Sequence, residues 1–78
     1  MYKRPHGERI SLLRRYEQEC YQICYYLLLD EQLALDAARR VLLTLYEDRA
    51  FIEAIEEQTR RSILTRRASE ASVSVVIT

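Results

Sequence analysis

Hydrophobic residues recur at helical spacing along most of the chain and divide it into three predicted helices. These helices cover residues 8–28, 31–46 and 49–67. In each of them apolar side chains return every three or four positions, with charged side chains between them. The pattern predicts an all-α fold, a three-helix domain. The chain has one glycine and one proline, so the connections between helices should be short and formed by other residues.

Acidic residues mark the two predicted corners. Asp30 and Asp48 each stand directly before a predicted helix, where a side-chain carboxylate can accept a hydrogen bond from a free backbone N–H group. The apolar stripes of the three helices should pack into one core. The residues expected in this core are Leu13, Tyr16, Ile23, Leu27, Leu35, Ala38, Leu42, Leu45, Phe51, Ile55 and Ile63.

The two ends of the chain break the helical pattern. Residues 1–7 contain Pro5 and Gly7 and show no periodicity, which predicts a flexible tail. Residues 68–78 alternate serine with alanine, valine and isoleucine, a composition typical of extended backbone. This second tail is expected to be extended or disordered. The alternative is a strand that pairs with another chain.

The end of the first predicted helix is apolar on nearly every side. From position 20 to position 29 the only polar residue apart from the cysteines and tyrosines is Gln22. Such a helix must be covered on more than one face. We therefore expect self-association or tight binding to another protein through Tyr25, Tyr26 and Leu29.

Charge excludes some functions and leaves others open. The 78 residues carry 12 basic and 12 acidic side chains, so the net field does not favour unaided binding of nucleic acid. A local basic cluster, Arg60, Arg61, Arg66 and Arg67, is a candidate for nucleic-acid contact. An apolar run that could serve as a signal peptide or cross a membrane is absent from the sequence, and a cytoplasmic location is expected.

Catalytic chemistry is not indicated by the residue pattern. His6 is the only histidine and lies in the predicted tail, without the fixed partners that a general base needs. Glycine-rich phosphate loops and nucleophile motifs are not found. Cys20 and Cys24 share one helical face, where they are poorly placed to form a disulfide and supply too few ligands for zinc. We expect a non-enzyme without a cofactor, in which both thiols are reduced and buried.

The segment from residue 27 to residue 48 carries an ordered set of small, acidic and large apolar residues. This set consists of Leu28, Asp30, Ala34, Asp36, Ala37, Val41, Leu43, Leu45 and Tyr46. The order resembles the first two helices of region 2 of a bacterial extracytoplasmic-function sigma factor (group IV). The resemblance extends back through Tyr21, Tyr16 and Leu13, and weakly forward to Arg67.

The resemblance implies a transcription co-factor whose second helix docks on the clamp of the RNA polymerase β′ subunit. The implied docking face consists of Asp36, Arg39, Arg40 and Leu43, which lie at i, i+3, i+4 and i+7 on one side of a helix. Arg39 and Arg40 stand where the family has a glutamine and an acidic residue. A charge reversal of this kind changes which partner is accepted.

The resemblance does not reach the segments with which a complete sigma factor melts and reads promoter DNA. It therefore implies one subunit of a split sigma factor, in which a separate helix-turn-helix subunit reads the promoter and DNA is contacted only within the complex. The alternative is a homo-oligomeric helical interaction module, such as a homodimer, or a regulator without polymerase contact.

Overall fold

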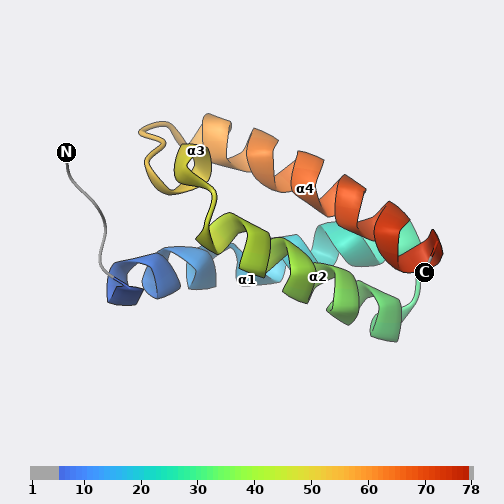
Figure 1. The fold of residues 1–78 in the computed structure, drawn as a ribbon. Helices are drawn as coiled ribbons and strands as arrows, with labels where there is room; N and C mark the ends of the chain where they lie inside the picture. Colours follow the sequence, from blue (N-terminus) through green and yellow to red (C-terminus); the bar gives the residue numbers. More distant parts are fainter. Residues whose placement is uncertain (1–5, 78) are drawn as a thin grey trace.

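The computed structural model describes residues 6–77, and these residues form four helices and no strand. The helices are α1 (His6–Leu28), α2 (Glu31–Tyr46), α3 (Arg49–Ile52) and α4 (Glu57–Ile77). The predicted all-α class is confirmed. In Figure 1, α1 and α4 run in the same direction and α2 runs in the opposite direction. The bundle is elongated, measuring 39 × 22 × 19 Å.

The α1/α2 hairpin has the boundaries that its sequence predicts. Asp30 caps α2, because its side chain accepts a hydrogen bond of 3.0 Å from the backbone N–H of Leu33. Before this cap, Leu29 takes the left-handed conformation with φ of 54°, and its N–H donates to the carbonyl of Tyr25 at 2.7 Å. The chain thus reverses direction with a left-handed residue just after the helix end.

The predicted third helix, residues 49–67, is wrong because the chain turns between α3 and α4. Asp48 caps α3 as expected and accepts from the N–H of Phe51 at 3.2 Å. Phe51 and Ile52 are both buried, whereas Ile55 is 96% exposed. A continuous helix would keep Ile55 near the face of these two residues. The turn over residues 53–56 instead releases Ile55 to solvent and lets α4 fold back on the hairpin.

The predicted extended or disordered tail over residues 68–78 is also wrong. Helix α4 continues to Ile77, and Thr78 lies outside the described residues. Ala68, Ser72 and Val75 are buried at helical spacing, so tertiary packing overrides the preference of valine for extended backbone. Of the predicted flexible tail over residues 1–7, residues 1–5 lie outside the described residues, and α1 already begins at His6.

The core lies where the three long helices meet and combines large apolar side chains with alanine, cysteine and valine. Six of the predicted core residues are buried, and Ile23 and Leu42 pack against the core while half-buried. The confirmed six are Leu13, Tyr16, Ala38, Leu45, Phe51 and Ile63. Leu27, Leu35 and Ile55 are exposed, so their prediction as core residues is wrong.

Small residues explain why the core stripe is displaced from these large side chains. The stripe of α2 is centred on Ala34 and Ala37, and that of α1 on Cys20 and Cys24, all of which are fully buried. Small side chains let helix backbones approach each other closely. The large leucines beside them, including Leu27 and Leu35, are therefore turned toward the surface.

Candidate protein-binding surfaces

The outer face of α2 is the surface on which the resemblance places a docking site. Helix α2 packs between α1 and α4, and its alanines are buried there. Asp36, Arg39, Arg40 and Leu43 are all exposed, so the structure brings the four predicted residues onto one solvent-facing surface. Arg40 is additionally tied to α4, because its Nη1 donates to Ser74 Oγ at 3.1 Å.

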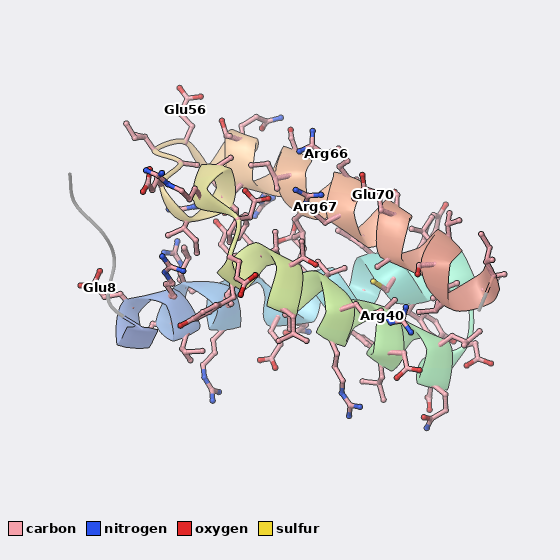
Figure 2. All side chains as sticks on the ribbon, in the orientation of Figure 1. Glu8, Arg40, Glu56, Arg66, Arg67 and Glu70 are labelled. Carbon is pink, nitrogen blue, oxygen red and sulfur yellow. The ribbon has the colours of Figure 1, made fainter. Side chains whose placement is uncertain are left out.

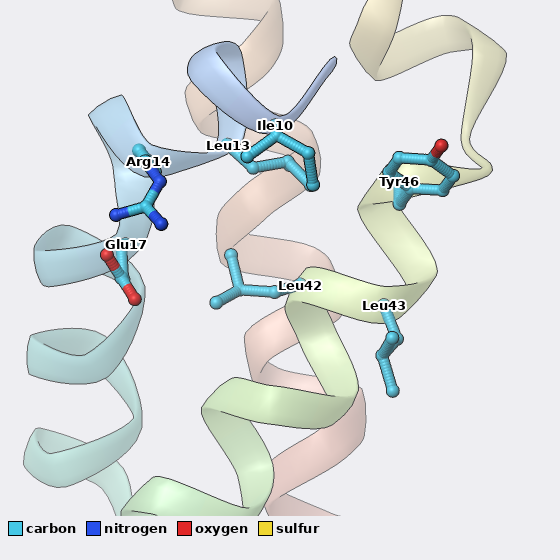
Figure 3. A pocket seen from close by; sticks show the side chains of 7 residues that line it. All are labelled: Ile10, Leu13, Arg14, Glu17, Leu42, Leu43 and Tyr46. Carbon is cyan, nitrogen blue, oxygen red and sulfur yellow. The ribbon is translucent and has the colours of Figure 1, made fainter. Parts of the chain in front are cut away.

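A groove runs along the seam between α1 and α2. It encloses about 380 Å³, and Figure 3 shows side chains of both helices around it. The lining residues are Ile10, Leu13, Arg14, Glu17, Leu42, Leu43 and Tyr46. Leu43, 73% exposed, belongs both to this groove and to the predicted docking face. The groove therefore extends that face toward α1 with apolar side chains and a charged rim.

Sequence analysis did not identify Ile10 and Tyr46 as surface residues of this groove. The end of the groove is organised by Arg9, whose guanidinium donates to the carbonyl oxygen of Tyr46 at 2.9 Å and lies 5.2 Å from the centre of its ring. Helical periodicity predicts that Ile10 lies on an apolar stripe of α1. It does not predict that α4 leaves the part of this stripe around Ile10 uncovered.

The predicted association residues Tyr25, Tyr26 and Leu29 do not form one patch. Tyr25 stacks on Tyr21 with ring centres 6.1 Å apart, whereas Tyr26 lines a groove together with Ser69 of α4. Successive residues of an α-helix point about 100° apart, so adjacent tyrosines reach different sides of α1. Leu29 lies beyond the end of α1, in the turn of the hairpin.

A second groove follows the seam between α1 and α4. It consists of two hollows of about 400 Å³ and 360 Å³ that share Leu27 and Ser69. Val73, Val76 and Ile77 line its far end. Sequence analysis missed this groove because it assigned these residues to a non-helical tail. Their spacing of three and four positions is the signal that could have revealed it.

The predicted basic cluster is not a free surface. Arg60 is only 8% exposed, and it donates to the carbonyls of Phe51 and Ile52, both at 2.9 Å. It closes the end of α3 and is not available for the predicted nucleic-acid contact. Arg61 forms ion pairs with the carboxylates of Glu57 and Glu19, with N···O distances of 3.1 Å and 3.8 Å.

The other two arginines of the cluster point to different sides of α4. Arg67 contacts the carboxylates of Asp48 and Glu70, each at 3.2 Å, and these hydrogen bonds raise the pKa of its guanidinium. Arg66 is exposed, and Figure 2 shows it directed away from the hairpin. Three of the four arginines thus link α4 to other parts of the bundle: Arg60 to α3, Arg61 to α1, and Arg67 to the cap of α3.

The two cysteines lie inside the bundle. Both thiols are fully buried, as predicted, and Cys20 Sγ lies 3.8 Å from the carbonyl oxygen of Ala38, to which it donates. The adjacent Cys24 thiol and burial raise the pKa of the Cys20 thiol. Within residues 6–77, acidic, histidine and cysteine side chains form no group of three or more that could hold a metal ion.

Two further findings concern the whole described chain. None of the four helices combines the length and the apolar character needed to cross a membrane. Comparison with protein-family models, with curated proteins and with solved structures finds no match to this chain.

Proposed function

We propose that this protein is a sigma region 2-like transcription co-factor that docks on the β′ clamp of RNA polymerase through the outer face of α2. One observation carries the proposal. In the segment that resembles region 2, Ala34 and Ala37 are buried, whereas Asp36, Arg39 and Leu43 are exposed. A docking helix needs this division, because one side must bind its own domain and the other must remain free for the partner.

The way in which α2 is held supports the same proposal. The helix is capped by Asp30 at its start and packs against both α1 and α4. A face presented by a fixed helix loses little conformational freedom when it binds, which favours affinity. The apolar α1/α2 groove beside Leu43 provides additional surface for the partner.

The two arginines on the outer face of α2 bear on which partner this face would accept. Arg39 is exposed at the position where the family has a glutamine, while the guanidinium of Arg40 already bonds to Ser74. Arg39 is therefore the charge best placed to select a partner. An acidic side chain opposite Arg39 would be attracted, and a basic one would be repelled.

In this proposal a separate subunit of a split sigma factor makes most of the DNA contacts. Arg60, Arg61 and Arg67 are engaged within the domain, so the predicted basic cluster offers little free positive charge to a phosphate backbone. Promoter reading then falls to a separate helix-turn-helix subunit, and this chain supplies the contact with polymerase.

A pull-down with purified β′ clamp tests the proposal. The wild-type chain, with or without a co-expressed helix-turn-helix subunit, should retain the clamp, and Arg39→Glu should reduce retention in a salt-dependent way. Arg66→Glu is the matched control, because it makes the same charge reversal on the far side of α4. Absence of clamp binding by the wild-type chain under both conditions would refute the proposal.

A second candidate function is a helical protein-interaction module without polymerase contact. The specific observation in its favour is that two apolar grooves, one on each side of α1, are left uncovered. Uncovered apolar surface of this kind, rimmed by polar residues, is typical of sites that bind other proteins. Capture of partners with the intact chain, followed by a direct test with the β′ clamp, separates the two functions.

A further inference from the structure

We infer that two copies of this chain pair through the seam between α1 and α4. The α1/α4 face consists of Tyr26 and Leu27 from α1 and Val73, Val76 and Ile77 from α4. These side chains are between 48% and 80% exposed. The inference does not depend on polymerase docking, because it involves none of the residues on the outer face of α2.

The size of the face suits a dimer. From their exposed fractions the five side chains expose on the order of 600 Å² of mostly apolar surface, at the upper end of the roughly 300–600 Å² of the largest patch on a typical monomer. A standard protein interface buries about 800 Å² on each partner. The half-buried side chains at the margin of the face, Ile23 and Leu28, add to this surface. Two such faces would bury on the order of 1,200 Å² in total, the lower limit of specific interfaces, so the α1/α4 face suits a weak dimer.

The charge of the face also favours a second copy. Among the residues that line the two hollows, only Glu19 is charged, and it lies at the end away from Val73 and Ile77. The α1/α2 groove differs, because Arg14 and Glu17 stand on its rim. A charged partner would gain no attraction at the α1/α4 face. An identical apolar face meets no repulsion there and buries its own exposed side chains at the same time.

The shape of the α1/α4 face, with both hollows and projecting side chains, suits a two-fold symmetric interface. Such an interface uses the same patch on both copies, so each patch must provide both projecting and receiving parts. Here the hollows around Leu27 and Ser69 lie between the strongly exposed Tyr26 and Ile77. Helices α1 and α4 run in the same direction along this seam (Figure 1). Pairing would bring four helices, two from each copy, around one apolar seam.

Pairing of this kind leaves α2 accessible. The helices α1, α2 and α4 contact one another pairwise, so the seam between α1 and α4 lies on the side of the bundle opposite the outer face of α2. The residues that line the α1/α4 hollows are all different from those that line the α1/α2 groove. A dimer could therefore present two α2 faces at once.

Sedimentation velocity of the intact chain, from about 1 µM to about 500 µM, tests the inference, since a weak interface of this size dissociates in that range. The wild-type chain should shift from monomer to dimer. Val76→Glu places a charge within the face and should raise the dissociation constant at least about 10-fold. Leu43→Glu is the control, because it changes an exposed apolar residue outside the face and should leave dimerisation unchanged.

A second variant separates loss of pairing from loss of folding. Ser69→Arg changes an exposed residue between the two hollows, so it should block pairing while circular dichroism shows the helices intact. A wild-type chain that stays monomeric over the whole range would overturn the inference. A dimer that Leu43→Glu dissolves, while Val76→Glu and Ser69→Arg leave it unchanged, would overturn it as well and move the interface to the α1/α2 groove.

Discussion

The two ends of the bundle are held together in different ways. At the end that contains α3, polar contacts close the structure: Arg60 bonds to the carbonyls of α3, and Arg67 bonds to the capping residue Asp48. At the opposite end, where α1 stops and α4 finishes, the prominent exposed side chains are Leu29, Val76 and Ile77. One end is closed by side-chain hydrogen bonds to α3 and to its cap, and the other has no such closure and leaves a cluster of apolar side chains in water.

This difference separates a structural end from an interacting one. Hydrogen bonds are directional and impose a geometry on the turn between α3 and α4. Apolar contact has no such direction, so a face made of valine, leucine and isoleucine can be covered by another molecule with little rearrangement. We call the end where α1 stops and α4 finishes the open end. We therefore expect substitutions at the α3 end to change stability, and substitutions at the open end to change association.

The largest effect on stability is expected at Phe51. Its side chain is fully buried and meets the ring of Tyr16 edge-on, with the ring centres 5.4 Å apart. Phe51→Ala should lower the free energy of unfolding by about 3–5 kcal/mol. Ile77→Ala, at the open end, should change it by less than about 0.5 kcal/mol in the monomer. Urea denaturation at low protein concentration measures both, and equal losses would erase the distinction between the two ends.

Arg60 should have the next largest effect. Its guanidinium is buried and serves two carbonyl groups, which would lose their donors in an Arg60→Met variant. The expected loss is about 2–4 kcal/mol. Arg60→Lys should rescue little, because an ammonium group does not reproduce the planar pair of donors. Arg66→Met, on the exposed side of α4, should leave the denaturation midpoint unchanged, and a comparable shift there would contradict the structural role of Arg60.

Asp48 combines two functions at the same end, and its substitution should have a smaller effect. One carboxylate oxygen accepts from the N–H of Phe51 and the other from Arg67. Asp48→Ala should cost about 1–2 kcal/mol, the usual value of a helix cap. Asp48→Asn keeps an oxygen for the cap and should recover most of this loss. If asparagine and alanine were equally destabilising, the ion pair with Arg67 and not the cap would be the main contribution.

The parts of the fold that were predictable depend on local signals. The α1/α2 hairpin follows from helical periodicity and from Asp30, which acts on its own next turn. The break after α3 depends on Arg60, whose bonds reach back eight and nine positions. A periodic pattern includes no such contact, and Ile55 fits that pattern as well as Phe51 does. The helical end of α4 likewise depends on burial of Val75, which only the folded bundle provides.

The candidate surfaces also differ in how far the sequence predicts them. Exposure of Asp36, Arg39 and Leu43 follows from their place on α2 opposite its alanines, so sequence reasoning could place them. The α1/α4 face could not be found while residues 68–78 were assigned to a non-helical tail. Tyr25 and Tyr26 lie on different sides of α1, because a helix directs neighbouring residues to different sides. Association through both of them stays a prediction, and it would involve two surfaces.

A small gain in stability is expected at Leu29, in the turn at the end of the bundle opposite α3. A leucine with φ of 54° is strained, and its side chain is 74% exposed. Leu29→Gly should therefore stabilise the chain by up to about 1 kcal/mol, because glycine adopts this conformation without steric cost. Leu43→Gly is a matched control at 73% exposure, and it should destabilise by about 1 kcal/mol because it lies within a helix.

The same variant reports on the role of Leu29 in association. Leu29 does not line the hollows of the α1/α4 face, so Leu29→Gly should raise the thermal midpoint and leave the sedimentation profile unchanged. A more stable chain that dimerises less well would add Leu29 to the interface, as the sequence analysis expected. A chain that is less stable than wild type at monomeric concentrations would contradict the assignment of strain to this turn.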